Sequence, residues 1–184
     1  MQAKDLSCND FLLSYIDERV EDVKWHAPRI SSNHCTNLIK SEIEFDNNFA
    51  EWFGIWLAEG SWTDCAISFT IGSHEKRLYN RILSLTEQVF GLTHPTIYRR
   101  DANHSVIIQY NSKHLCLFFE QLYGRECDQA NQWTKYVPPS IMVGAPTIQL
   151  QLVKGWLDGD GYYRETTSPR YKGTTVSAIL AEQM

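Results

Sequence analysis

The chain has 184 residues, of which 43% are hydrophobic and 12% aromatic, enough for one domain with a sizeable core. Its net charge of −5 at pH 7 argues against a strongly basic DNA-binding protein, and it contains no run of 18 apolar residues that would span a membrane. The N-terminus lacks the pattern of a signal peptide, and the five scattered cysteines form no CxxC pair. We therefore expect an intracellular, cytoplasmic protein without a zinc site or a disulfide framework.

The charge is unevenly distributed along the chain. Residues 1–60 hold five basic and 11 acidic side chains, whereas residues 61–184 hold 12 basic and 11 acidic ones. Only the second part is therefore suited to lie against a polyanion, and it is mildly basic at best. We expect weak non-specific affinity for nucleic acid that falls steeply as the salt concentration rises.

The first segments of the chain have a weak pattern. The apolar run Phe11–Ile16, with polar flanks, predicts a short strand after a turn. Residues 31–45 combine a polar linker with one apolar turn. Asp46 or Asn47 has a side chain suited to cap a helix that runs to Glu59.

A strand and a helix are predicted next. Cys65–Ile71 alternates apolar and small polar residues, which predicts a half-buried strand with Cys65 on its apolar face. A helix capped by Ser73 is expected to run to about residue 90, and Gly91 ends it. Its inward face is predicted to carry Leu78, Ile82, Leu85 and Val89.

Two further strands, Thr96–Arg100 and Ser105–Asn111, are predicted to form a hairpin, and Ser112 caps a helix over 113–123. Polar side chains collect on one predicted face of the strands: Ser68, Thr70, Arg99 or Arg100, Gln109 and Asn111. Such a face can read base edges in the major groove of DNA, and it is equally typical of any sheet face that meets solvent. The register of the strands leaves the choice between Arg99 and Arg100 open.

Pro146 suits the first turn of a further helix, which is expected to end at Gly161. Tyr162–Glu165 and Thr174–Ser177 are then predicted as paired strands, and the last residue of the second strand caps a helix that starts at Ala178. This mixture of helices and hairpin strands predicts the α+β class.

One motif occurs twice in the chain. The segments 52–60 (WFGIWLAEG) and 153–161 (VKGWLDGDG) each carry small residues at the third and seventh positions, an acid at the eighth and a glycine at the ninth. Small residues at i and i+4 share one helix face and let two helix backbones approach closely. We therefore expect two helices packed along these faces, each ended by a glycine in the left-handed conformation.

The acid at the end of each motif helix, Glu59 or Asp160, is badly placed for stability. A carboxylate at a helix C-terminus faces the negative end of the helix dipole, at a cost of roughly 0.3–1 kcal/mol. If the two helices run parallel, the carboxylates also repel each other. Two neighbouring carboxylates suit Mg²⁺, which supports phosphodiester hydrolysis. The alternative is a pair of ordinary buried helices that end in acids.

With its two motif copies 101 positions apart, the chain resembles the LAGLIDADG (dodecapeptide, DOD-type) homing endonucleases, especially those inserted in inteins, over most of residues 35–175. The resemblance implies αββαββα half-domains that meet at the motif helices, a divalent metal ion and cleavage of double-stranded DNA on a saddle-shaped sheet. It also implies that Glu59 and Asp160 are the metal-binding catalytic acids. The polar sheet-face residues would contact the DNA.

Two shorter segments carry the same resemblance. Lys135 and Pro138 form a Lys-x-x-Pro sequence ahead of the second motif, as in intein endonucleases, which implies that Lys135 points into the active site and assists catalysis. The alternative for Lys135 is an ordinary surface lysine. Residues 3–10 are similar to a splicing-domain segment that precedes intein endonucleases, with Asn9 in the usual glycine position. An ordinary edge strand or N-terminal extension is the alternative there.

The resemblance implies three parts: a splicing-domain remnant over 1–30, a first half-domain over 31–144 and the start of a second over 145–184. Only 23 residues follow Gly161, so we expect a truncated second half. The alternatives are a fragment that lacks its C-terminal half, a degenerate reading frame, and one half that needs a complementing chain. The implied reaction is Mg²⁺-dependent hydrolysis of both DNA strands. The alternative is a non-cleaving DNA- or RNA-binding module on the same scaffold, either maturase-like or a decayed nuclease.

Overall fold

The stretch from Asn47 to Tyr123 alternates one helix with two strands. The computed structural model of the protein describes residues 23–30, 37–123, 135–164 and 170–184. In this stretch the elements are α1 (Asn47–Glu59), β3 (Gly60–Trp62), β4 (Ile67–Gly72), α2 (Lys76–Phe90), β5 (Thr96–Arg100), a 3₁₀ turn η2 (Asp101–Asn103), β6 (Ser105–Tyr110) and α3 (Lys113–Tyr123). The α+β class predicted from the sequence is confirmed.

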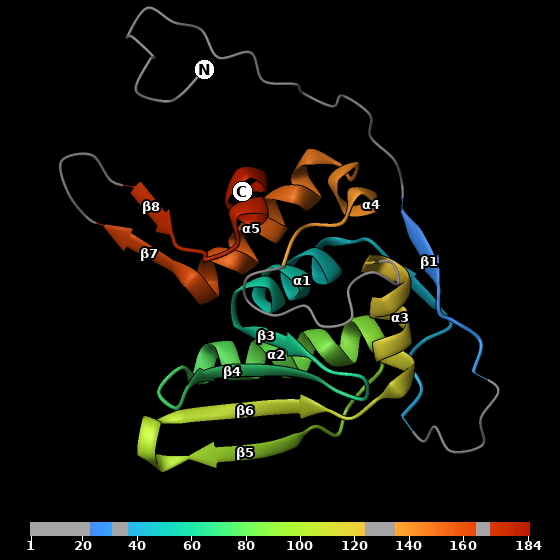
Figure 1. Ribbon diagram of the computed structural model, residues 1–184, viewed down its shortest axis with the longest axis horizontal. Coiled ribbons are helices and arrows are strands. Elements are labelled where there is room, and N and C mark those ends of the chain that lie inside the picture. The colour runs from blue at the N-terminus through green and yellow to red at the C-terminus, as the bar shows by residue number, and fades with distance from the viewer. Residues whose placement is uncertain (1–22, 31–36, 124–134, 165–169) are drawn as a thin grey trace, which may run out of the picture.

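The remaining elements flank this stretch. Two short strands precede it and pair antiparallel: β1 (Lys24–His26) and β2 (Glu42–Glu44). The elements that follow it are α4 (Pro139–Met142), α5 (Pro146–Asp160), β7 (Gly161–Arg164), β8 (Arg170–Gly173) and α6 (Ala178–Gln183). Strands β7 and β8 form an antiparallel ribbon that extends from the end of α5 (Figure 1). The strand predicted over 11–16 lies outside the described residues.

Four strands form one antiparallel sheet in the order β3-β4-β6-β5. Side chains directly opposite each other on neighbouring strands share a face, so the register sorts the sheet into two faces. One face is apolar and buried, and it carries Ile67, Phe69, Ile71, Val106 and Ile108. The residues of the other face are exposed or half-buried. The helices therefore pack on one side of this sheet (Figure 1).

Helix α1 is apolar on nearly every side because it occupies the middle of the core. Its four large aromatic residues are all 0% exposed: Phe49, Trp52, Phe53 and Trp56. The Trp52 ring lies 5.5 Å from the Phe69 ring of β4, and its Nε1 donates to Thr86 Oγ1 of α2 at 2.8 Å. The Asp46 side chain caps the helix, as predicted, by accepting from the Phe49 N–H at 2.8 Å.

Helices α1 and α5 lie side by side (Figure 1). A Cβ built on Gly54 would lie 2.1 Å from the carbonyl oxygen of Leu152, and one built on Gly155 would lie 2.3 Å from that of Glu51. Real Cβ atoms do not approach carbonyl oxygens so closely, so each position requires glycine. The predicted close packing of the two motif helices along their small residues is confirmed.

The glycines that end the motif helices are not in the predicted left-handed conformation. Gly60 has φ −85° and Gly161 has φ −89°, both with extended backbone. The helices pass directly into β3 and β7, and a Cβ at either corner would meet the last helical turn. It would lie 2.4 Å from the Trp56 oxygen at Gly60 and 2.0 Å from the Leu157 oxygen at Gly161. Crowding, rather than a positive φ, therefore requires glycine here.

Two predicted boundaries in the first stretch differ from the structure. Strand β4 begins at Ile67, because a turn closed by the Thr63 N–H on the Ala66 carbonyl precedes it. The turn leaves Cys65 exposed and buries Ala66, the reverse of the prediction. Helix α2 begins at Lys76.

The predicted partner strand over 174–177 is also wrong. The strand opposite β7 is β8, in which Gly173 pairs with Gly161. Thr175 instead accepts from the Ser177 N–H through its hydroxyl, which leads the chain into α6. Ser177 caps α6 as predicted by accepting from the Leu180 N–H.

Candidate functional site

The packing of α1 on α5 brings two acids together. Glu59 and Asp160 are the last residues of their helices. A Cβ on Gly159 would lie 2.5 Å from the Ala58 Cβ and 3.0 Å from the Glu59 Cγ, so the two helix ends touch. The negative charge of Asp160 also acts on Glu59 and raises its pKa. The structure thus places the two motif acids at one site.

Both acids hold their protons more tightly than ordinary carboxyl groups. The pKa of Glu59 is raised to about 7, first by burial and then by the negative charges of Asp160 and Glu75, with Lys135 opposing. Burial likewise raises the pKa of Asp160, and Lys135 again opposes. Such shifts are expected where two acids share a poorly solvated site, and a bound cation would reverse them.

Lys135 reaches the same helix end from the segment before α4. Its Nζ donates to the carbonyl oxygens of Leu57 at 2.8 Å and Trp56 at 3.1 Å, and the residue is only 4% exposed. Burial lowers the pKa of Lys135 to about 8, although the charges of Asp160 and Glu59 act to raise it. A cation at a helix C-terminus offsets the negative end of the dipole. Lys135 is therefore a buried capping cation beside the acids and not a surface lysine.

The open face of the four-stranded sheet carries a row of polar side chains. Ser68 lies opposite Gln109, and Thr70 lies one pair further along on the same face. Gln109 Nε2 donates to Asn111 Oδ1 at 2.6 Å, and Asn111 Nδ2 donates to Thr96 Oγ1 at 3.1 Å. The predicted contact residues Ser68, Thr70, Gln109 and Asn111 therefore share the open face, and a hydrogen bond joins the last two.

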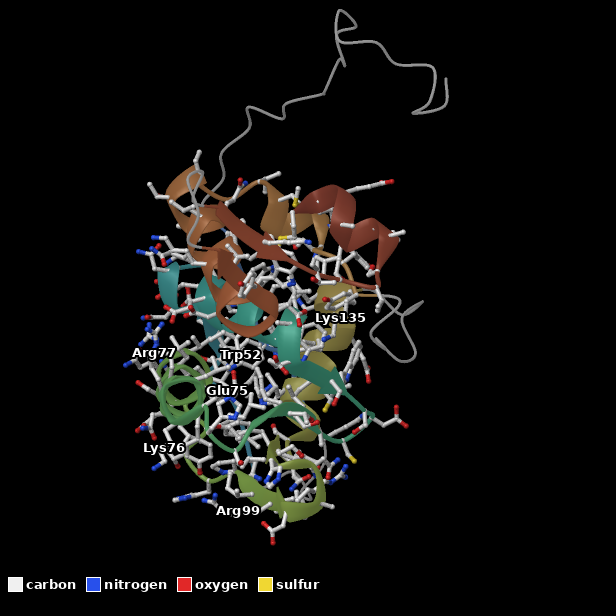
Figure 2. The ribbon with its side chains drawn as sticks, turned by 90° about the vertical axis from the view of Figure 1, so that its left-hand side faces the viewer. Trp52, Glu75, Lys76, Arg77, Arg99 and Lys135 are labelled. Atoms are coloured by element: carbon white, nitrogen blue, oxygen red, sulfur yellow. The ribbon has the colours of Figure 1, made fainter. Side chains whose placement is uncertain are left out.

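The strand register separates the two arginines of β5. Arg100 lies opposite Ser105 and shares the open face, whereas Arg99 lies opposite the buried Val106. Arg99 accordingly turns to the other side of the edge strand, where it lines a pocket of about 260 Å³ together with Lys76 of α2 (Figure 2). The open face thus includes Arg100 and not Arg99.

The acids fit a hydrated cation better than a cage of protein ligands. Within the described ranges, no three or more His, Cys, Asp or Glu side chains come together as a metal-binding group. Mg²⁺ is commonly held by only one or two carboxylates and keeps several water molecules. Glu59 and Asp160 supply two such carboxylates, and the repulsion between them makes a divalent cation favourable there.

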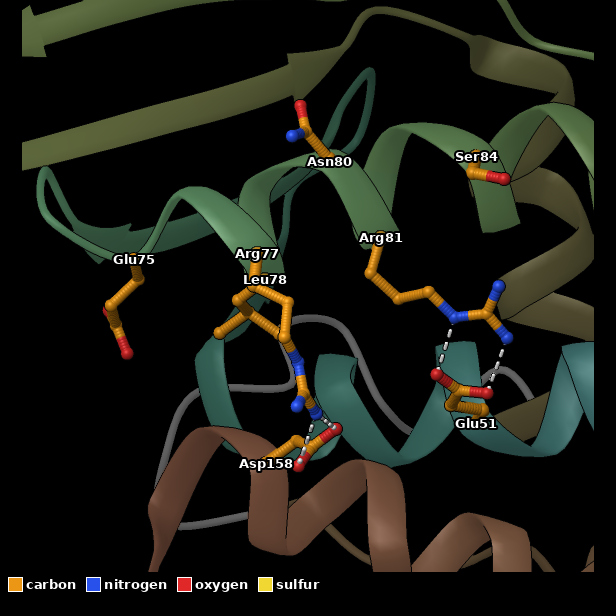
Figure 3. Close-up of a pocket in the computed structure, with 8 residues that line it drawn as sticks. All are labelled: Glu51, Glu75, Arg77, Leu78, Asn80, Arg81, Ser84 and Asp158. Atoms are coloured by element: carbon orange, nitrogen blue, oxygen red, sulfur yellow. Dashed lines mark hydrogen bonds and ion pairs between the residues drawn. The ribbon is translucent and has the colours of Figure 1, made fainter.

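A cleft along α2 was not predicted from the sequence. Its volume is about 720 Å³, and its lining is formed by Glu51, Glu75, Arg77, Leu78, Asn80, Arg81, Ser84 and Asp158 (Figure 3). Arg81 binds Glu51 through two hydrogen bonds of 2.6 Å, and Arg77 lies 3.2 Å from Asp158. The spacing of the two arginines on one helix face was the available signal. The Arg81 pair ties α2 to α1, and the Arg77 pair spans α2 and α5 with the arginine side chain 88% exposed.

Glu75 was missed as well. Its Oε2 accepts from the Gly72 N–H at 2.5 Å, and its negative charge helps to raise the pKa of Glu59. An acid three residues after Gly72 gave no sequence signal for this, because the contact depends on how β4 meets α2.

Comparison with known proteins gives two distant relatives of much greater length. An uncharacterized protein of Methanocaldococcus jannaschii is 29% identical over 188 aligned residues, which cover 99% of this chain and 22% of the relative. ATP-dependent DNA helicase Hel308 of Thermococcus kodakarensis is 26% identical over 140 residues, which cover 73% of this chain and 12% of the helicase. The chain therefore spans about a fifth of the first relative and about an eighth of the second. No family model matches the chain.

None of the helices in the described parts of the chain has the length and apolar character needed to cross a membrane.

Proposed function

We propose that this chain is a LAGLIDADG-type, intein-encoded homing endonuclease unit that hydrolyses both strands of double-stranded DNA with Mg²⁺. One observation carries the proposal: two glycine-packed helices end in Glu59 and Asp160 at a shared, poorly solvated site. Neither acid stabilises the helix that it ends. Placing both at one point is costly for folding and useful for holding a cation.

The order of elements supports the same assignment. From α1 to α3 the chain runs helix, two strands, helix, two strands, helix, which is the αββαββα order of one half-domain. The second motif helix, α5, is again followed by two strands and a helix. Such a repeat around a helix pair fits two half-domains that meet at α1 and α5.

In the proposed reaction the residues of the chain prepare the site for a cation and a phosphate. Glu59 and Asp160 would hold Mg²⁺, which supplies activation of the attacking water and stabilisation of charge on the phosphate. To bind it, Glu59 must lose the proton that its raised pKa of about 7 favours. Lys135 places a positive charge beside both acids and caps the carbonyl groups at the end of α1.

The open sheet face is the proposed DNA-contacting surface. Its side chains offer both donors and acceptors for base edges, and Arg100 adds a positive charge. The helicase relative acts on DNA according to its name, which agrees with a DNA partner for this chain. A segment that matches only a fifth or an eighth of longer proteins also fits a module carried within larger chains.

A second candidate is a module of the same fold that binds DNA or RNA without cutting. The engagement of Lys135 favours it, because the ammonium group donates to main-chain carbonyl groups and is almost completely buried. A lysine held in this way supports the helix end and is not presented to a phosphate.

The test is Mg²⁺-dependent cleavage of a plasmid library with random inserts, compared between the wild type and the variants Glu59→Gln and Asp160→Asn. We expect the wild type to produce double-strand breaks that both variants fail to produce while still binding duplex DNA. Glu182→Gln, an exposed acid of α6, is the matched control and should cut normally. Cleavage by Asp160→Asn at the wild-type rate would refute its role. Binding without any cleavage by the wild type would establish the second candidate.

A further inference from the structure

The short segment that carries Lys135 is bonded by side chains on two sides. Helix α6 provides one side: Ser177 Oγ donates to the Lys135 carbonyl oxygen at 2.7 Å. Gln183 accepts from the Val137 N–H at 2.7 Å and donates to the Val137 carbonyl oxygen at 2.9 Å. The amide of Gln183 therefore pairs with both main-chain groups of Val137, as a neighbouring strand would.

Helix α3 provides the other side. The hydroxyl group of Tyr123 donates to the Tyr136 carbonyl oxygen at 2.9 Å, and that of Tyr136 donates back to the Tyr123 carbonyl oxygen at 3.0 Å. The main chain of residues 135 and 137 thus faces α6, while that of residue 136 faces α3. Three consecutive residues are fixed although they belong to no strand.

Because residues 135–137 are held in place, the Lys135 ammonium group is also held at the end of α1. Lysine has a long and flexible side chain, so its ammonium group stays at one place only when the main chain and the surroundings hold it. Here Val137 is 2% exposed and Lys135 is 4% exposed, with Nζ seated on the last carbonyl groups of α1. The connection runs from α6 through the main chain of Lys135 to the end of α1.

We propose that Ser177 and Gln183 are positioning residues: through the main chain of residues 135–137 they hold the Lys135 ammonium group against the end of α1, beside Glu59 and Asp160. Helix α6, which follows the second motif helix, thereby fixes the position of the ammonium group that caps the C-terminal end of α1. The consequence for cleavage rests on the proposed nuclease function, whereas the position of Lys135 is tested without it.

Two measurements on the full chain test whether Ser177 and Gln183 hold Lys135 in place. The first is the rate at which a small acylating reagent modifies Lys135, followed by peptide mass spectrometry at one fixed pH. The variants are Gln183→Ala, which loses both bonds to Val137, and the milder Gln183→Glu, which keeps an acceptor for the Val137 N–H but loses the donor. We expect acylation of Lys135 to rise about tenfold in Gln183→Ala and less in Gln183→Glu, since hydrogen bonds of ordinary strength control the local opening.

Matched variants separate positioning from general loosening. Ser177→Thr keeps the hydroxyl group for both the Lys135 carbonyl and the α6 cap and should restore protection, whereas Ser177→Ala should not. Glu182→Ala changes an exposed residue on the same helix and should leave acylation unchanged. Unchanged acylation of Lys135 in a folded Gln183→Ala, Ser177→Ala double variant would overturn the inference.

The second measurement is DNA cleavage kinetics with the same variants. A positioning role predicts that kcat falls in Gln183→Ala while KM for DNA stays constant, because the sheet face is untouched. A rise in KM with constant kcat would overturn the positioning role. If the wild type cuts no DNA while Lys135 is acylated faster in Gln183→Ala, the positioning of Lys135 by α6 would be supported and the nuclease function would be overturned.

Discussion

Gly54 of α1 faces the carbonyl oxygen of Leu152 of α5 at a distance that no larger residue can accommodate. A Cβ on Gly54 would lie 2.1 Å from this oxygen and 2.7 Å from the Trp156 nitrogen, both of them main-chain atoms. At an uncrowded helix position, replacing glycine by alanine stabilises a protein by up to about 1 kcal/mol. We expect Gly54→Ala to destabilise the protein instead, by about 2–3 kcal/mol, because the two helices must separate.

Chemical denaturation would measure the sign of this effect. Asn80→Ala, at an exposed position of α2, is the control and should change the free energy of unfolding by no more than about 0.5 kcal/mol. A stabilised Gly54→Ala variant would mean that the two motif helices are not in close contact in solution.

The raised pKa of Glu59 predicts that stability depends on pH. Below the unfolded-state pKa of 4.5 the carboxyl group is protonated in both states and costs nothing. As the pH rises from 4.5 to about 7, the unfolded chain releases this proton while the folded protein keeps it, so the folded protein loses stability, and the loss is complete above the folded-state pKa. We expect Glu59→Gln to stabilise the protein at pH 8.5 by about 1–2 kcal/mol, a value reduced for the solvent that still reaches the side chain.

Urea denaturation at pH 8.5 and at pH 4.5 would measure this difference. The gain from Glu59→Gln should disappear at the lower pH, while the control Glu182→Gln should show no such dependence. An equal effect of Glu59→Gln at both pH values would contradict the raised pKa of Glu59.

Thr86 and Trp52 form a buried hydrogen bond between α2 and α1. Thr86 is 0% exposed, and its hydroxyl group accepts from Trp52 Nε1 at 2.8 Å. Thr86→Val keeps the shape and leaves the indole N–H without this acceptor, so we expect a loss of about 1–3 kcal/mol. Thermal unfolding should show a lower Tm for Thr86→Val, whereas Thr70→Val on the open sheet face should leave Tm nearly constant. Equal melting temperatures for both variants would argue against the bond.

Arg99 and Arg100 are adjacent in sequence and lie on opposite sides of β5, which makes them a matched pair. If the open face contacts DNA, Arg100→Ala should weaken binding to a random duplex and reduce the salt dependence by about one counterion. Arg99→Ala should have the smaller effect, because this residue faces the pocket beside α2. Fluorescence anisotropy titrations at several salt concentrations would rank the two variants by their affinity for DNA. The opposite ranking would place the DNA beside α2, next to Arg99, and not on the open face.

Local sequence patterns were sufficient to place most of the helices. The apolar spacing of Leu78, Ile82, Leu85 and Val89 predicts the buried face of α2, and all four are buried. Gly91 adopts the left-handed conformation with φ +77°, as expected for a residue that ends a helix. The small residues at i and i+4 likewise predict the contact of α1 with α5, because sterics at a helix surface depend on a few neighbouring positions.

Features that depend on distant pairing could not be derived in this way. The face of Arg99 follows from its position opposite Val106, and the sequence does not specify the register of a hairpin with this turn. Lys135 donates a hydrogen bond to the carbonyl oxygen of Leu57, 78 positions earlier in the chain, and this contact depends on how three helices assemble. The two bonds of Gln183 to Val137 have no sequence signature, since a glutamine near the end of a helix is usually solvated.

The reciprocal bonds between Tyr123 and Tyr136 hold together two residues that are 13 positions apart in the sequence. The entropy of closing a loop grows only slowly with its length, so extra residues placed between the two tyrosines would add little to the cost of folding. Lys135 lies next to Tyr136, and its position is held by the bond from Ser177 to its carbonyl oxygen and by the bonds from its ammonium group to α1. Residues added between Tyr123 and Lys135, such as a reporter tag, should therefore leave the Lys135 ammonium group and the end of α1 in place.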